Sequence, residues 1–216
     1  METSLIYLPV SLGEAIDKFT ILDIKLDIIK DARKKDVQTE YDILYTKLQP
    51  FIEKYGDLYR TMKKVNKLIW DMMDILRDGN VNEEKYLKIC KECIDYNDIR
   101  FRVKNKINFV SNSTLKEQKS YKINRLVLII NKNIDSDSTI LLNIIKYFSY
   151  IYDEISIKNE SNVEYLKIHF EYDNTIVFTG ETLDYKCKVV IEDTEYVGSK
   201  IYDLFNITEF EINKII

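Results

Sequence analysis

The stretch from Ser11 to Lys25 constrains the fold most strongly, because it carries a complete start signal for a long helix. Pro9 prevents a helix from entering from upstream. Ser11 and Glu14 fit a capping box, in which the Ser11 side chain accepts from the Glu14 amide and Glu14 returns to the Ser11 amide. Charged side chains then follow at helical spacing and form one stripe: Glu14, Asp17, Lys18 and Lys25.

Apolar residues at helical spacing predict four long helices in the first half of the chain. Their expected ranges are 12–34, 37–54, 57–77 and 82–110. Pro50 should kink the second helix or restart it. Gly79 suits a left-handed C-cap and Asn82 an N-cap, so a tight turn should join the third and fourth helices. Because the links are short, we expect an antiparallel helical bundle over residues 1–120.

The periodicity changes after Ser113, and the remaining residues, 121–216, predict a small α/β domain with a mixed sheet. We expect a hairpin between 166–170 and 175–179, because Leu166, Ile168 and Phe170 alternate with polar residues. The other expected elements are strands at 125–130, 154–158, 187–191 and 210–212, and helices at 139–152 and 197–205. The fold class is therefore α+β.

Composition narrows the classes of partner and location. A net charge of −4 and a pI near 5.3 give no broad electrostatic drive toward nucleic acid or an anionic membrane. No segment resembles a membrane span, and Met1 to Ser4 lacks the basic start of a signal peptide. Three cysteines fit a reducing compartment. We expect a cytoplasmic protein without a nucleic-acid partner, and the oligomeric state stays open.

A second polar stripe lies on the fourth predicted helix. If it faces the first stripe, the two could converge into one polar network. One interpretation is a binding site for a ligand or a protein partner. The alternatives are a structural network that serves fold specificity, or two stripes that face solvent separately. The residues of the second stripe are Asn97, Asp98, Arg100, Lys104 and Asn108.

Other chemistry-bearing residues give weaker signals. Cys90 and Cys93 form a C-x-x-C pair, but they lie inside a predicted helix rather than at its N-terminus, which favours core packing over redox chemistry. His169 is the single histidine and falls on the polar side of a predicted strand, which indicates a surface residue. Asp135 and Asp137 form a D-x-D pattern after a predicted buried strand, which suits a divalent cation on a diphosphate or ordinary helix capping.

The segments from Pro9 to Lys25 and from Asn97 to Tyr121 together resemble a domain family of unknown function, numbered 6165. The resemblance covers about residues 5–121 and implies a compact helical protein, found alone in bacteria, often near glycan-assembly genes, and as an N-terminal module in proteins of large DNA viruses. It implies no reaction. It points to the same residues as the two stripes. The following segment looks faintly like the first unit of a glycosyltransferase but is too short for a complete nucleotide-binding half.

Three functional hypotheses follow. The first is a non-enzymatic accessory or interaction module in glycan assembly, with a protein partner and no cofactor. The second is a reduced glycosyltransferase-like protein that binds a nucleotide sugar through Mg²⁺ or Mn²⁺ held by Asp135 and Asp137. The third is a viral structural or host-interaction protein in the host cytoplasm. Aromatic anchors for a partner could come from Tyr7, Tyr41, Tyr45, Tyr55, Tyr59 and Trp70.

Overall fold

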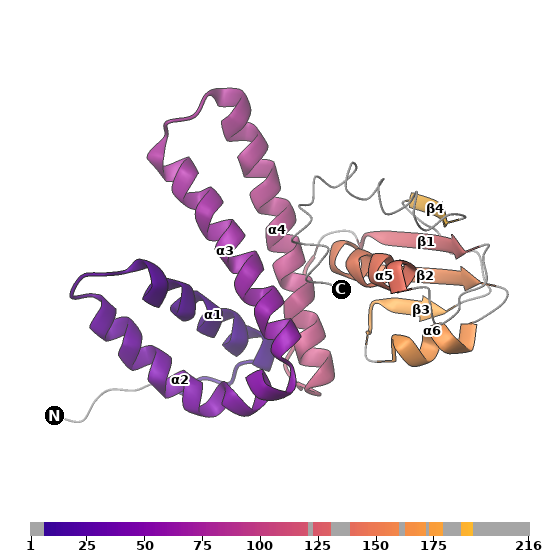
Figure 1. Cartoon of the computed structure of the whole chain (residues 1–216), viewed down its shortest axis with the longest axis horizontal. Helices are drawn as coiled ribbons and strands as arrows, with labels where there is room; N and C mark the ends of the chain where they lie inside the picture. Colours follow the sequence, from indigo (N-terminus) through magenta and orange to yellow (C-terminus); the bar gives the residue numbers. More distant parts are fainter. Residues whose placement is uncertain are drawn as a thin grey trace. The chain divides into compact units, whose positions relative to one another are not determined.

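The structure is a computed structural model, and it describes residues 7–120, 123–130, 139–159, 163–171, 173–178 and 187–191. The chain divides into two compact units, and the boundary between them lies between Gln118 and Lys119. The first unit is helical and the second contains a small sheet, so the fold is α+β (Figure 1). The expected helix at 197–205 and strand at 210–212 lie outside the described residues. No helix of the described part is long and apolar enough to cross a membrane.

The first unit contains four helices, as the periodicity predicts. Their bounds are α1 Leu12–Ile28, α2 Lys34–Lys54, α3 Gly56–Asp78 and α4 Glu83–Val110. Helix α1 contacts all three of the others, and α3 and α4 run side by side (Figure 1). The core of this unit gathers around α1, whose Ile16 and Phe19 are completely buried. Met62 of α3 and Val103 and Ile107 of α4 are also completely buried.

The first two helices differ from the prediction at the end of α1 and at Pro50 of α2. Helix α1 ends at Ile28 rather than near residue 34, since Ile29 already has an extended backbone conformation. In the link that follows, the Asp31 side chain accepts from the Arg33 amide and guanidinium. Such local side-chain contacts compete with helical hydrogen bonding. Helix α2 continues through Pro50 and ends at Lys54, as predicted, so of the two expected effects of Pro50, a kink or a restart, the restart is wrong.

A left-handed residue ends α4 and turns the chain back. Asn112 has φ +51°, and its amide donates to the Phe109 carbonyl. The Ser113 amide donates to the Asn108 carbonyl. These two hydrogen bonds form a Schellman motif, with asparagine in the position that glycine usually takes.

We expect Asn112→Val to destabilise the helical unit by about 1–2 kcal/mol, since a β-branched residue is strained in the left-handed region. Asn112→Gly should leave stability unchanged or raise it slightly, because glycine adopts this conformation without strain. Urea unfolding of both variants tests the prediction. Equal destabilisation by the two substitutions would show that the Asn112 side chain, rather than its backbone conformation, matters.

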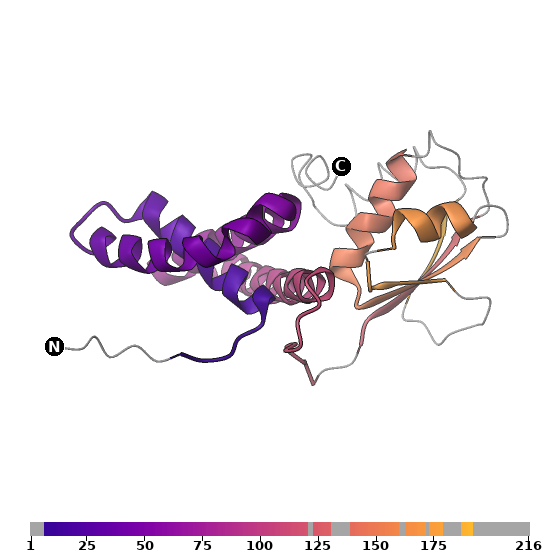
Figure 2. The ribbon, with the colours of Figure 1, turned by 90° about the horizontal axis from the view of Figure 1, so that it is seen from below.

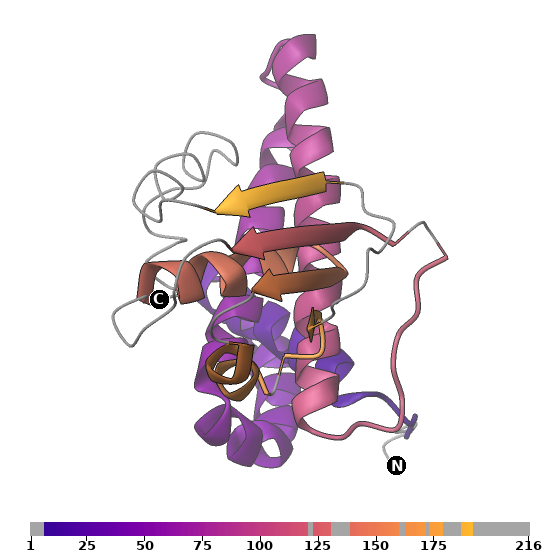
Figure 3. The ribbon, with the colours of Figure 1, turned by 90° about the vertical axis from the view of Figure 1, so that its right-hand side faces the viewer.

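The second unit is a parallel α/β unit. Its elements are β1 Arg125–Ile130, α5 Thr139–Ile151, β2 Glu154–Asn159, α6 Val163–His169, β3 Ile176–Phe178 and β4 Cys187–Ile191. The strands lie in the order β3-β2-β1-β4, and every pairing between these described strands is parallel (Figure 3). The expected mixed sheet is therefore wrong for the described strands.

The expected hairpin is also wrong, because residues 163–169 form helix α6 and β3 pairs in parallel with β2. Leu166 and Phe170 are buried at a spacing of four, whereas Ile168 is 74% exposed. Residues four apart share one face of a helix, and they also share one face of a strand. The exposed Ile168 between Leu166 and Phe170 gave the run the alternation that is typical of a strand.

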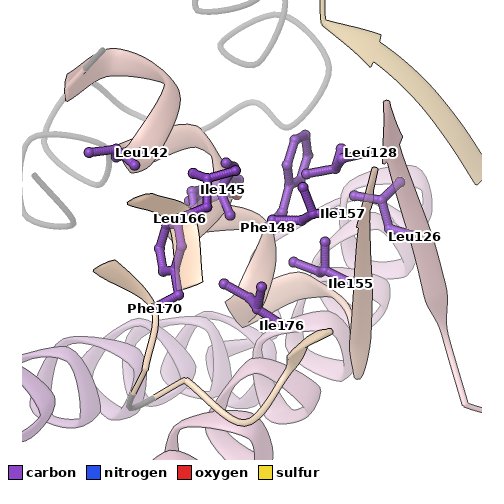
Figure 4. Packing of buried hydrophobic residues seen from close by; sticks show 11 residues of the cluster. Leu126, Leu128, Leu142, Ile145, Phe148, Ile155, Ile157, Leu166, Phe170 and Ile176 are labelled. Atoms are coloured by element: carbon purple, nitrogen blue, oxygen red, sulfur yellow. The ribbon is translucent and has the colours of Figure 1, made fainter. Parts of the chain in front are cut away.

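Helices α5 and α6 cover the same face of the sheet (Figure 2). Leu126 and Leu128 of β1 and Ile155 and Ile157 of β2 point into this layer. Figure 4 shows these strand residues together with Ile145 and Phe148 of α5, Leu166 of α6 and Phe170, which follows α6. Right-handed crossovers place successive helices on one face when the strands are added in one direction, as from β1 to β3.

Candidate functional site

The strongest candidate site is a polar seam between α1 and α4, which we define as Gly13, Glu14, Asp17, Lys104 and Asn108. It begins at the N-terminus of α1, where the Ser11 hydroxyl accepts from the Glu14 amide at 3.1 Å. This half of the expected capping box is confirmed. The Glu14 carboxylate accepts from Lys104 Nζ at 3.0 Å, so it reaches α4 rather than the Ser11 amide.

Gly13 brings the two helices into close contact. Its amide donates to Asn108 Oδ1 at 2.7 Å, and Asn108 is completely buried. A Cβ atom at Gly13 would lie 2.5 Å from the Lys104 carbonyl oxygen and 2.9 Å from Asn108 Oδ1. Only glycine therefore fits between α1 and α4 at this point.

Lys104 is the centre of charge in the seam. Its side chain is 8% exposed and contacts the carboxylates of Glu14, Asp17 at 3.9 Å, and Glu117. Burial alone would lower the pKa of the Lys104 ammonium, but the hydrogen bonds to Glu117 and Glu14 and the charge of Asp17 outweigh burial, so the pKa is raised. Lys104 is thus a buried cation neutralised from two sides.

Helix α3 joins the seam through Asp17. The Asn66 amide group donates to Asp17 Oδ1 at 2.7 Å and to Thr20 Oγ1 at 2.8 Å. The Thr20 hydroxyl donates to the Asp17 carbonyl. Asp17, Thr20 and Asn66 are all buried. The Asn66 amide nitrogen, the Thr20 hydroxyl and Asp17 Oδ1 are therefore hydrogen-bonded, as buried polar groups usually are.

The structure brings together Glu14, Asp17, Lys104 and Asn108 of the expected site residues. Lys18 instead pairs with Glu40 of α2 at 2.6 Å, and both side chains are well exposed. Lys25 is half-buried, and its carbonyl caps the end of α1. The remaining three are half-buried on α4 before Lys104, and none of the seam contacts described above includes them: Asn97, Asp98 and Arg100.

The metal-binding hypothesis gains no support here. Asp135 and Asp137 lie outside the described residues. Within the part of the chain that the structure describes, no three His, Cys, Asp or Glu side chains gather in a way that could hold a metal ion.

Cys90 and Cys93 are half-buried on α4 and do not form a disulfide. Burial raises the pKa of the Cys93 thiol, and Cys90 and Glu92 add to the shift. A raised pKa keeps the thiol protonated, which opposes redox chemistry. His169 is exposed, as expected, but it lies at the end of helix α6 rather than on a strand.

A second polar cluster, between α1 and α3, was not predicted from the sequence. Tyr59 donates to Asp23 Oδ2 at 2.6 Å, and Lys63 binds Asp23 at 2.8 Å and Asp27 at 3.5 Å. The spacing of four between Tyr59 and Lys63, and between Asp23 and Asp27, was the signal that could have found it.

The same region holds aromatic side chains that the sequence offered as partner anchors. Tyr41 stacks on the buried Phe19 at 4.6 Å, and Tyr59 lies 6.1 Å from the same ring. Most of these tyrosine contacts therefore serve the packing of α1 against α2 and α3. Tyr45 and Tyr7, by contrast, are 40% and 80% exposed.

Alkaline pH should reveal the Tyr59 contact. Burial and the hydrogen bond to Asp23 raise the pKa of Tyr59 above its ordinary value of about 10. The unfolded chain then loses the phenol proton at lower pH than the folded one, so this contribution to stability is complete below about pH 10 and falls as the pH rises further. The stability advantage of the wild type over Tyr59→Phe should shrink by up to about 1.4 kcal/mol per pH unit above pH 10. Urea unfolding from pH 8 to 11, with the exposed Tyr86→Phe as a control, measures this difference; a constant advantage would contradict the prediction.

The protein thus consists of a helical unit, in which a polar network joins α1 to α4, and a small parallel α/β unit that follows it in the chain. The model of the family described as "Family of unknown function (DUF6165)" matches residues 6–132, and the chain belongs to this family. The match extends past the expected limit near residue 121 and includes strand β1. No curated protein and no solved structure matches the chain.

Proposed function

We propose that this protein is a non-enzymatic interaction module that binds a protein partner through the outer side of α4. The observation that carries the proposal is an apolar stripe formed by Leu87, Cys90 and Ile94. Leu87 is 53% and Ile94 is 64% exposed. A spacing of three, four and seven residues places these side chains on one side of the helix.

The position of the apolar stripe supports the proposal that a protein partner binds there. In α3, the buried residues are Met62, Val65 and Asn66, all in the first half of that helix. The outer parts of α3 and α4 therefore pack mainly on each other, and Ile75 and Tyr86 of these parts are also exposed. Exposed apolar side chains that gather in one place, rather than being scattered, are typical of interaction surfaces.

A photo-crosslinking amino acid in place of Leu87 tests the proposal. It should give one discrete adduct in cells, because a specific partner covers the stripe. The same amino acid in place of Lys88, which points about 100° away around the helix, is the matched control. Ile94→Asp should abolish the adduct without lowering the melting temperature, since Ile94 is exposed. Adducts of equal yield at Leu87 and Lys88, or none at Leu87, would refute the interaction surface. The adduct mass distinguishes a second copy from another protein.

The setting that we propose is the cytoplasm, in association with glycan assembly, as the family resemblance implies. The same resemblance supports, as a further proposal, a viral structural or host-interaction role in the host cytoplasm if the chain comes from a large DNA virus. The identity of the cross-linked partner separates the two settings: a glycan-assembly enzyme supports the first, and a virion or host protein supports the second.

A second candidate function is nucleotide-sugar binding, and the strand order favours it. The chain adds β2 and β3 on one side of β1 and β4 on the other, so the direction of winding switches at β1. In parallel sheets, ligands bind beyond the carboxyl ends of the strands at such a switch point. Asp135 and Asp137 follow β1 in the sequence and precede α5.

Thermal shift measurements with nucleotide sugars and Mn²⁺ or Mg²⁺ test this candidate, because a ligand of the folded state raises the melting temperature. A metal-dependent shift that Asp135→Ala abolishes and Glu171→Ala preserves would support nucleotide-sugar binding and count against the non-enzymatic proposal. A shift that does not depend on Asp135 would refute the D-x-D site.

A further inference from the structure

The segment after α4 folds back along that helix. The Schellman motif at Asn112 reverses the chain direction, and residues 113–118, which we call the strap, have neither helical nor strand structure. Glu117 of the strap nevertheless contacts Nζ of Lys104. Lys104 lies six residues before the last residue of α4, or about 9 Å along the helix axis. The Glu117 side chain therefore contacts a residue that lies nearly two helical turns before the end of α4.

The contact is built on a buried cation rather than on a surface pair. The Lys104 side chain is 8% exposed and Glu117 is 31% exposed. The other partners of Lys104, Glu14 and Asp17, are both held on α1. A charged hydrogen bond to a buried ammonium is stronger than an exposed ion pair. Glu117 is thus the one of these three carboxylates that ties an irregular segment to the helices.

Loss of the negative charge would have different effects at Glu117 and at the two carboxylates of α1. If Glu117 lost its charge, Lys104 would keep Glu14 and Asp17 as counter-charges, so the helices would stay together. The strap would lose this ionic contact at its outer end, leaving the hydrogen bonds of the Schellman motif at its start. The contact of Glu117 therefore affects the position of the strap, whereas the contacts of Glu14 and Asp17 affect the packing of the helices.

We infer that Glu117 and Lys104 form a latch that holds the strap on the helical unit and that opens when the Glu117 charge is removed. Gln118 is the last residue of the first unit. The closed latch therefore fixes the point at which the chain leaves the helices, and it places one carboxylate on the ammonium of Lys104. The open latch frees the strap and removes this carboxylate from Lys104, so that an anionic group of a partner can take its place.

Backbone ¹⁵N relaxation of the full chain tests the latch. In the wild type, the amides of residues 115–118 should have order parameters near those of the helices, about 0.85. In Glu117→Gln they should fall below about 0.6, while the amides of α1 and α4 keep their values. Glu14→Gln is the matched control, because it removes a carboxylate from the same ammonium but from a helix. It should leave the order parameters of the strap unchanged.

Three results would overturn the inference. Low order parameters at residues 115–118 in the wild type would show that the strap is not held. Unchanged values in Glu117→Gln would show that another contact holds it. An equal fall in Glu14→Gln and Glu117→Gln would show that the strap responds to the charge of the whole seam and not to its own carboxylate. Thermal unfolding of both variants confirms that the helical unit remains folded during the measurement.

Discussion

Gly13→Ala is expected to destabilise the helical unit by about 2–5 kcal/mol. The new Cβ would lie 2.5 Å from the Lys104 carbonyl oxygen, closer than two such atoms can approach. This neighbour is backbone inside α4, so it cannot rotate away as a flexible side chain would. If α1 moved outward instead, the Gly13 amide would lose its hydrogen bond to the buried Asn108. Both responses cost free energy, and the second leaves a buried polar group without its partner.

Gly56→Ala is the matched control for this experiment. Gly56 is the first residue of α3, and its Cβ would meet only the flexible side chain of Arg60, at 3.1 Å. Alanine is a better helix former than glycine, so Gly56→Ala should be neutral or slightly stabilising. Urea unfolding followed by the fluorescence of Trp70, the single tryptophan, measures both variants. Equal stability of Gly13→Ala and the wild type would show that α1 and α4 do not approach each other at Gly13.

Lys104→Met should destabilise the helical unit by about 3 kcal/mol or more. Methionine fills a similar volume, so packing is largely kept. The substitution removes the positive charge that contacts Glu14, Asp17 and Glu117. Asp17 is buried and cannot turn to solvent, so its charge would remain without compensation beside two further carboxylates. For this reason, removing one partner of a buried ion pair lowers the free energy of unfolding by more than the intact pair contributes to it.

Lys18→Met provides the control, because Lys18 belongs to the same charged stripe of the sequence but pairs with Glu40 on the surface. Exposed pairs contribute little, and the loss should stay below about 1 kcal/mol. Adding Glu14→Gln and Glu117→Gln to Lys104→Met should restore part of the stability, since fewer negative charges then repel each other. No restoration would show that the lysine stem, and not its charge, stabilises the seam. Urea unfolding at pH 7 measures all of these variants.

The helical unit follows closely from local signals in the sequence. The Ser11 cap, the Asn82 cap and the left-handed Gly79 all appear where the sequence places them. Each of these signals acts through a hydrogen bond or a backbone conformation within a few residues. The end of α1 at Ile28 was missed because the residues that follow it, such as Asp31 and Arg33, are also compatible with a helix.

The second unit was predicted less accurately from the sequence, because its helices and strands are too short to show a clear periodicity. Leu166, Ile168 and Phe170 fit both a strand and a helix, and only the burial of two of the three distinguishes them. The parallel sheet then depends on strand partners that are far apart in the sequence, such as β1 and β4.

For the candidate site, the sequence identified two polar stripes but not how they pair. Glu14 and Lys18 lie one turn apart on α1, yet one contacts α4 and the other α2. No local pattern separates them, because α1 packs against both helices and the boundary between the two contacts falls between these residues. Asn66 and Glu117 were not predicted, because their partners in the seam are far away in the sequence.

The sequence by itself determined where the long helices begin, which of their faces are apolar, and which residues could carry charge into a seam. These properties are local, since caps and periodicity act within one or two turns. Only the tertiary structure decided which charges meet, and that Lys104 takes carboxylates from both α1 and the strap. The physical reason is that the partner of a buried charge is selected by the close packing of distant segments, here by the space that a missing Cβ leaves at Gly13.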